Sequence, residues 1–102
     1  MIQRSYDAPL VTVLMPVYDA QPYLAEAVES VRGQTLESWE LLAVDDGSRD
    51  GSVEVLRGYA AVDPRIRVLI NKENQGVVAA LNRGLDEAKG RFIARMDADD
   101  RS

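Results

Sequence analysis

The chain has no cysteine and no histidine among its 102 residues. The first absence excludes disulfide bonds and thiolate metal sites, and the second removes the usual general base and the commonest zinc ligand. Any bound metal ion must therefore be held by oxygen atoms. Oxygen ligands favour hard ions, which are magnesium, manganese or calcium.

Long apolar segments are also missing. No run of about 18 apolar residues occurs, and the opening stretch MIQRSYDAPL lacks the apolar core of a signal peptide. We therefore expect a cytoplasmic location for this stretch, and a position at the cytoplasmic face of a membrane stays open for the full-length protein.

Basic residues are outnumbered by acidic ones. Lys and Arg total 12 against 17 Asp and Glu, which gives a net charge of -5. Nucleic-acid binding draws most of its affinity from basic groups that neutralise phosphates, so we expect no nucleic-acid partner. A hydrophobic content of 46% in 102 residues is enough for one core, and we expect a single domain over residues 1–102.

Short apolar runs alternate with helical spacings along the chain. The runs predict strands, and the spacing of apolar residues between them predicts amphipathic helices. Such an alternation implies an α/β fold with a mainly parallel sheet and helices on both faces. The predicted strands cover 10–17, 40–44, 65–71 and 92–96, and the predicted helices cover 23–32, 53–61 and 78–88. Ser52 is expected to cap the second helix, and Val78 and Leu85 belong to the apolar stripe by which the third helix is expected to pack.

A polar cluster follows each predicted strand. In chain order the clusters are PVYD, DDGSRDGS, NKENQG and DADD. Ligands of parallel α/β sheets bind outside the carboxyl ends of the strands, so we expect these clusters to form one polar rim.

Each cluster also has a purely structural interpretation. DDGSRDGS suits a turn before a helix, PVYD suits a strand end with an exposed aromatic ring, and DADD suits a solvated strand end. Three carboxylates within four positions repel one another unless a cation offsets them, which favours a metal site for DADD. Neither a GxGxxG fingerprint nor a P-loop occurs, so these two phosphate-binding motifs are excluded.

The combination of clusters resembles a known family. VTVLMPVYD, ELLAVDDGSRDGS, NQGVVAALNRG and GRFIARMDADD, in this order, are similar to the N-terminal half of inverting glycosyltransferases of family 2. The resemblance extends from about residue 10 to the end. It implies a Rossmann-like GT-A nucleotide-binding half that binds a nucleotide-diphosphate sugar, with UDP-sugars favoured. It also implies a parent enzyme that transfers a hexosyl or related group to an acceptor not identified by these motifs.

The resemblance implies roles for four residues around the nucleotide. Pro16 and Tyr18 would border the base, with the Tyr18 ring packing against it. Asp46 would accept a hydrogen bond from the base, typically uracil. Asp45 beside it would also belong to the nucleotide site or would instead brace the loop.

The family's DXD pair corresponds to Asp97 and Asp99. The resemblance implies that Asp97 contacts the ribose and shares in metal binding, and that Asp99 binds the Mg²⁺ or Mn²⁺ ion that bridges the diphosphate. Asp100 is a common additional acid of the family, and its role is left open.

Family members continue past the DXD segment into a second half that supplies the acceptor site and a carboxylate general base. We therefore expect that base to lie beyond Ser102, and we interpret the chain as the nucleotide-sugar-binding part of a longer enzyme, inactive in transfer on its own.

Two other function classes remain as alternatives. Acids after neighbouring strands also occur in magnesium-binding phosphoacceptor domains, which switch partners instead of transferring sugars. That class needs a downstream lysine on a further strand, and no such strand follows here. A nucleotide-binding module without catalytic function is the other alternative.

The family's further strands and helices cover the sheet that this chain forms. Without them an apolar edge or face becomes exposed, so we expect the chain to associate into dimers or larger assemblies at high concentration. Sedimentation velocity over a concentration series measures this, and a monomer mass that does not change with concentration would contradict it.

Overall fold

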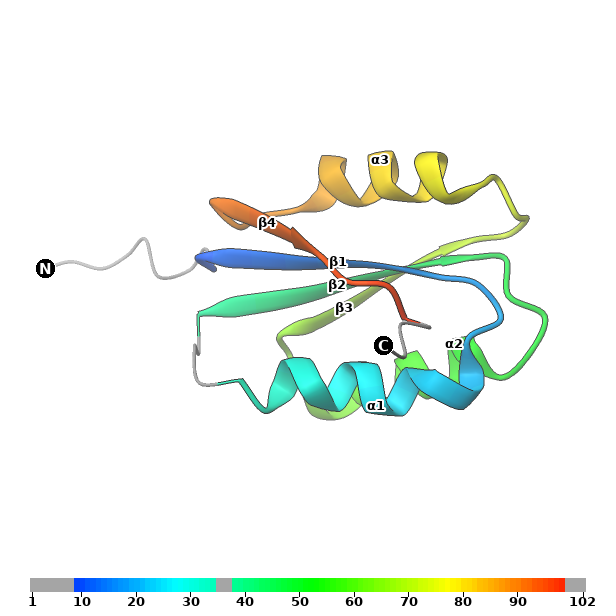
Figure 1. Ribbon diagram of the computed structural model, residues 1–102, viewed down its shortest axis with the longest axis horizontal. Helices are drawn as coiled ribbons and strands as arrows, with labels where there is room; N and C mark the ends of the chain where they lie inside the picture. Colours follow the sequence, from blue (N-terminus) through cyan, green and yellow to red (C-terminus); the bar gives the residue numbers. More distant parts are fainter. Residues whose placement is uncertain (1–8, 35–37, 99–102) are drawn as a thin grey trace, which may run out of the picture.

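The computed structural model describes residues 9–34 and 38–98, and Asp99 and Asp100 lie outside this part (Figure 1). Strands and helices alternate throughout, as predicted. The elements are β1 (Val11–Val17), α1 (Gln21–Arg32), β2 (Trp39–Asp46), α2 (Ser52–Val62), β3 (Ile66–Asn71), α3 (Val77–Glu87) and β4 (Phe92–Arg95).

The strands form one parallel sheet with the order β3-β2-β1-β4. Val11 of β1 pairs with Trp39 of β2 on one side and with Phe92 of β4 on the other. Asp46, the last residue of β2, is in register with Asn71, the last residue of β3. The expected α/β fold is thus confirmed, and the carboxyl ends of all four strands meet at one edge of the sheet.

Helices cover both faces of the sheet. Figure 1 shows α3 on one face and the pair α1 and α2 on the other. Every residue of β2 is buried, because this central strand is covered on both sides. Met15, Leu24 and Leu41 belong to the core under α1 and α2, whereas Leu42 and Ala80 belong to the core under α3.

The packing face of α3 differs from the expected stripe. The apolar spacing predicted that Val78 and Leu85 would pack against the sheet, yet they are 68% and 50% exposed. The small residues Ala80 and Gly84 face the sheet instead. They allow the α3 backbone to approach β1 so closely that a Cβ at position 84 would collide with Leu14 Cδ1.

The start of α2 also differs from the prediction. Ser52 was expected to cap this helix, but Gly51 occupies the N-cap position and no side chain caps it. Ser52 is the first helical residue, and its Oγ donates to Asp50 Oδ1 and accepts the Ala20 N–H. The Ser52 hydroxyl therefore links the loop after β1 to the loop after β2 and does not cap α2.

β4 forms one edge of the sheet and is exposed along its whole length. Phe92 and Ile93 are its largest exposed apolar side chains. Across the two described stretches, no helix is both long and apolar enough to cross a membrane.

A pair of glycine substitutions tests the close packing of α3. Gly84→Ala should lower the free energy of unfolding by about 1–3 kcal/mol, because the added methyl overpacks the contact with Leu14. Gly58→Ala is the matched control, since position 58 lies inside α2 and a Cβ there meets nothing within 4 Å. The control should be neutral or up to about 1 kcal/mol more stable. Urea denaturation followed by circular dichroism measures both, and equal stability of the two variants would contradict the close approach.

Candidate functional site

A cavity of about 470 Å³ lies at the carboxyl ends of the strands. It is lined by the end of β1 and the following loop, the end of β2, the start of α3 and the end of β4. The structure brings together four of the residues singled out from the sequence. Those residues are Pro16, Tyr18, Asp46 and Asp97.

Asp46 is the most constrained of these residues. Its side chain is almost completely buried, with 4% of the residue exposed. Oδ1 accepts hydrogen bonds from Asn71 Nδ2 and the Gln75 N–H, each at 2.9 Å, and Oδ2 accepts the Gly76 N–H at 2.8 Å. These donors connect the end of β2 to the end of β3 and to the start of α3.

The environment of Asp46 favours the ionised carboxylate. Burial alone would raise the pKa of Asp46, but the hydrogen bonds from Asn71, Gln75 and Gly76 outweigh it and lower the pKa below the usual aspartate value. The carboxylate also lies at the N-terminus of α3, where the helix dipole favours negative charge. Asp46 therefore presents a hydrogen-bond acceptor to the cavity at neutral pH.

The glycine after Asp46 is required by its surroundings. Gly47 has a φ of 81°, in the left-handed region that side chains avoid. A Cβ there would lie 2.7 Å from the backbone N of Asn74 and the backbone C of Glu73. The loop after β2 can therefore lie directly against the loop before α3, which lines the cavity through Asn74 and Gly76.

Asp45 does not line the cavity. It is fully buried, and its carboxylate accepts the Ser48 N–H at 2.9 Å and the Ser48 hydroxyl at 2.6 Å. The structure thus places Asp45 where it braces the loop after β2. Both of its oxygens accept hydrogen bonds from Ser48, which agrees with the bracing role considered for Asp45, and its part in a nucleotide site stays a prediction.

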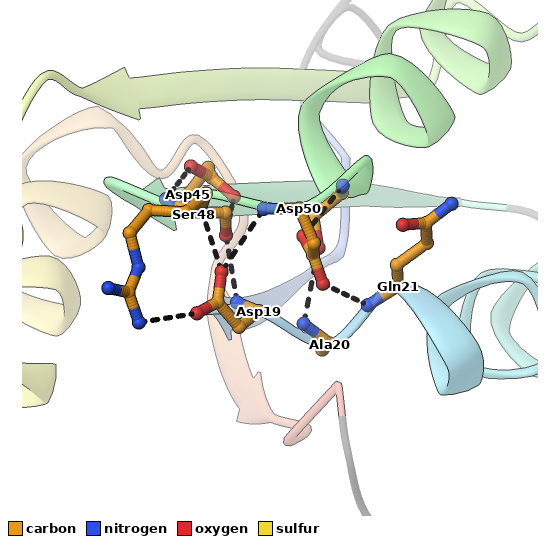
Figure 2. A network of polar contacts seen from close by, with 8 residues as sticks. Asp19, Ala20, Gln21, Asp45, Ser48 and Asp50 are labelled. Carbon is orange, nitrogen blue, oxygen red and sulfur yellow. Dashed lines mark hydrogen bonds and ion pairs between the residues drawn. The ribbon is translucent and has the colours of Figure 1, made fainter.

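Asp45 belongs to a clasp between the loops that follow β1 and β2 (Figure 2). Ser48 Oγ, which donates to Asp45, accepts the Asp19 N–H at 2.9 Å. Asp19 Oδ1 in turn accepts the N–H groups of Arg49 at 2.7 Å and of Asp50 at 3.3 Å. Asp50 Oδ2 completes the clasp by accepting the N–H of Gln21 at 3.1 Å.

The clasp holds Asp19 in an unusual backbone conformation. Asp19 has a φ of 48°, a left-handed value that costs an ordinary residue on the order of 1 kcal/mol. Tyr18 directly precedes it, lines the cavity and is 43% exposed. The turn at Asp19 therefore directly follows a partly exposed aromatic residue of the cavity lining.

Asp97 follows β4 and also lines the cavity. Its side chain is half exposed, and Oδ1 accepts a hydrogen bond from Arg95 Nε at 3.1 Å. In the part of the chain described by the structure, no three acidic side chains converge as a metal site. Asp99, the other expected metal ligand, is not among these residues.

The donor chemistry of Asp97 fits a hard divalent ion. Magnesium is commonly bound through one or two carboxylates together with substrate phosphates, and it keeps several waters. A single half-exposed carboxylate at the cavity is compatible with this mode of binding.

Sequence reasoning missed two contributors to the site. Arg95 lines the cavity beside Asp97. The sequence could have predicted this position, because residues two apart in an extended chain lie on the same side. Asn71 was recognised only as a strand end. Its contact with Asp46 follows from the register of β2 and β3, which the sequence does not specify.

The fold is a Rossmann-like α/β fold with a parallel sheet and a cavity at the carboxyl ends of its strands. The model of the family Glycosyl transferase family 2 matches residues 12–102, and the chain belongs to this family.

Curated relatives are similar over most of this chain. It is 42% identical over 93 residues to TuaG of Bacillus subtilis, a glycosyltransferase proposed for teichuronic acid biosynthesis. It is 40% identical over 91 residues to the glycosyltransferase GlyG of Streptococcus pneumoniae. These matches cover 91% and 89% of this chain but 37% and 30% of the relatives, so the chain spans about a third of their length.

Solved structures of GT-A glycosyltransferases share the fold. The mannosyltransferase PcManGT from Pyrobaculum calidifontis, in complex with GDP-Man and Mn²⁺, matches with a TM-score of 0.83 and 30% identity over 90% of this chain and 28% of its own. TarS from S. aureus, in complex with UDP-GlcNAc, matches with a TM-score of 0.81 and 26% identity over 87% of this chain and 26% of its own.

Replacement of Asp46 tests how much its buried charge contributes to the free energy of unfolding. Asp46→Asn should lower the free energy of unfolding at pH 7 by about 1–3 kcal/mol, because an amide cannot accept all three hydrogen bonds. Since the pKa of Asp46 is lowered in the folded state, its stabilisation is present above the ordinary carboxyl pKa of about 3.9 and is lost as the pH falls. The difference between variant and wild type should therefore shrink below pH 4.

Asp86→Asn is the matched control, because Asp86 is an exposed acid on α3 outside the cavity lining. Denaturant unfolding between pH 2 and pH 7 measures both variants. A deficit of Asp46→Asn that stays constant over this range would show that the charge does not contribute.

Proposed function

We propose that this chain is the donor-nucleotide site of a sugar-transferring enzyme, and that its cavity binds a nucleoside diphosphate sugar together with Mg²⁺ or Mn²⁺. The observation that carries the proposal is the convergence of an aromatic ring, a buried carboxylate and a half-exposed carboxylate on one cavity. Tyr18, Asp46 and Asp97 supply these three groups.

The base end of the cavity is formed by Tyr18 and Asp46. The accessible Tyr18 ring offers a stacking surface, and Asp46 offers an acceptor in a buried setting. An ionised carboxylate suits bases that carry a ring N–H, which are uracil, thymine and guanine. UDP-sugars are the favoured donors, and dTDP- and GDP-sugars carry the same hydrogen-bond donor.

The diphosphate end is formed by Asp97 and Arg95. Asp97 would hold the divalent ion, and the bound ion would stabilise the negative charge of the departing diphosphate. Arg95 Nη2 lies 3.1 Å from Asp97 Oδ1 and adds a positive group at the same end of the cavity. Asp97 and Arg95 would thus bind and orient the diphosphate between them.

The neighbouring structures support the binding of a nucleotide sugar together with a divalent ion. PcManGT is seen with GDP-Man and Mn²⁺, and TarS is seen with UDP-GlcNAc, so guanine and uracil donors both occur on this fold. The family match and the cavity support the same assignment for this chain.

Calorimetric titration of UDP into the chain, first with Mn²⁺ and then with EDTA, tests the proposal. Asp97→Asn should weaken UDP binding by roughly tenfold in Mn²⁺ and have little effect in EDTA, because it removes a metal ligand and leaves the base end intact. Tyr18→Ala should weaken binding in both conditions, because stacking does not depend on the ion.

Asp86→Asn serves again as the control for charge and should bind UDP as the wild type does. Failure of the wild type to bind UDP, dTDP or GDP in any condition would contradict the proposed function. Equal losses in Asp97→Asn with Mn²⁺ and with EDTA would contradict the metal assignment alone.

A further inference from the structure

A chain of side-chain hydrogen bonds leads from the surface of α3 to the buried carboxylate of Asp46. Arg83 Nη1 donates to Asn71 Oδ1 at 2.6 Å and also to the Ile70 carbonyl oxygen at 2.8 Å. Asn71 Nδ2 then donates to Asp46 Oδ1 at 2.9 Å. Asn71 is buried, whereas Arg83 is exposed.

The amide of Asn71 has only one orientation that satisfies both neighbours. A guanidinium group can only donate, and an ionised carboxylate can only accept. A flipped amide would set its NH₂ group against Arg83 and its oxygen against Asp46, and both hydrogen bonds would be lost. Arg83 and Asp46 thereby both favour the orientation in which Asn71 presents a donor to Asp46.

The donors around Asp46 occupy its two carboxylate oxygens unequally. Oδ1 is occupied by two donors, Asn71 and Gln75, and Oδ2 accepts one, from Gly76. A carboxylate has about four acceptor positions, so the donors described leave one on Oδ2. Asp46 lines the cavity, whereas neither Asn71 nor Arg83 is among the lining residues.

We propose that Arg83 and Asn71 are positioning residues that hold the Asp46 carboxylate in one orientation, with an Oδ2 acceptor toward the cavity, and so determine which nucleobase the cavity accepts. This inference rests on the proposed function, because it requires a nucleotide in the cavity. Arg83 and Asn71 act through Asp46 without touching the ligand.

Base selectivity is the property that depends on this orientation. Uracil has an N–H at ring position 3, which an acceptor can bind. Cytosine has a lone pair at the same position, which a fixed carboxylate repels. UDP and CDP share the ribose and the diphosphate, so the ratio of their affinities isolates the contact at the base. Without the Asn71 donor, Asp46 is held by Gln75 and Gly76 alone, and a less firmly oriented Oδ2 acceptor should favour uracil over cytosine less strongly.

The experiment measures the dissociation constants of UDP and CDP with Mn²⁺ for the wild type and four variants. Asn71→Ala removes the donor to Asp46, and Arg83→Met releases the amide while leaving Asn71 in place. Both should lower the UDP preference at least roughly fivefold, the scale of one lost hydrogen bond. Arg83→Lys retains a donor and should keep the preference within about twofold of the wild type. Arg57→Met changes an exposed arginine of α2 outside the cavity and should also leave the preference unchanged.

The outcomes distinguish a failure of the positioning role from a failure of the proposed function. A wild type that prefers UDP, with an unchanged preference in both Arg83→Met and Asn71→Ala, overturns the positioning role and leaves the proposed function intact. Absence of UDP, dTDP and GDP binding by the wild type overturns the proposed function, and this inference with it. Thermal unfolding of each variant excludes misfolding as the cause, and the exposed position of Arg83 makes Arg83→Met the decisive variant if Asn71→Ala is unstable.

Discussion

The buried carboxylate of Asp46 is the constraint on which the rest of the site depends. A charge removed from water costs several kcal/mol unless it is well hydrogen-bonded. Asp46 meets this condition by accepting one hydrogen bond from the side chain of Asn71 and two from the backbone of Gln75 and Gly76. These donors come from β3 and from the start of α3, so the requirement of one charge determines how three elements meet beside the cavity. The positive φ of Gly47 belongs to the same arrangement, because only a glycine permits the loop after β2 to approach the loop before α3 so closely.

Near the other end of β2, Glu40 is a further buried carboxylate with a different role. Glu40 accepts hydrogen bonds from Thr12 Oγ1 at 2.6 Å and from the Lys89 N–H at 2.8 Å, and it forms an ion pair with Arg67 at 2.9 Å. The charge of Glu40 is thereby neutralised by a cation within the fold. The donors described for Asp46 are all neutral amides, so its negative charge remains available to a ligand at the cavity. One end of the strand therefore stabilises the sheet, and the other end can recognise a ligand.

Much of this arrangement could be predicted from the sequence, because the alternation of strands and helices and the polar clusters after each strand are local patterns. The order β3-β2-β1-β4 and the contact of Asn71 with Asp46 depend on strand register, which the pattern does not specify. The packing face of α3 was misjudged because large apolar side chains were expected inside, whereas the close approach to Leu14 requires Gly84. Asp45 was grouped with Asp46 because the two are adjacent in sequence. Successive residues of a strand point to opposite faces, and only one of the two reaches the cavity.

The central claim is that a nucleotide occupies this cavity with its base beside Asp46. The most direct measurement is a titration of UDP with Mg²⁺ into the isotopically labelled chain, followed by nuclear magnetic resonance of the backbone amides and the Asn71 side-chain amide. The account predicts that the largest changes occur at Tyr18, at Gly76 and at the Asn71 NH₂ group, while Arg57 on α2 is unaffected. Saturable changes confined to α1 and α2, with none at these three residues, would contradict it.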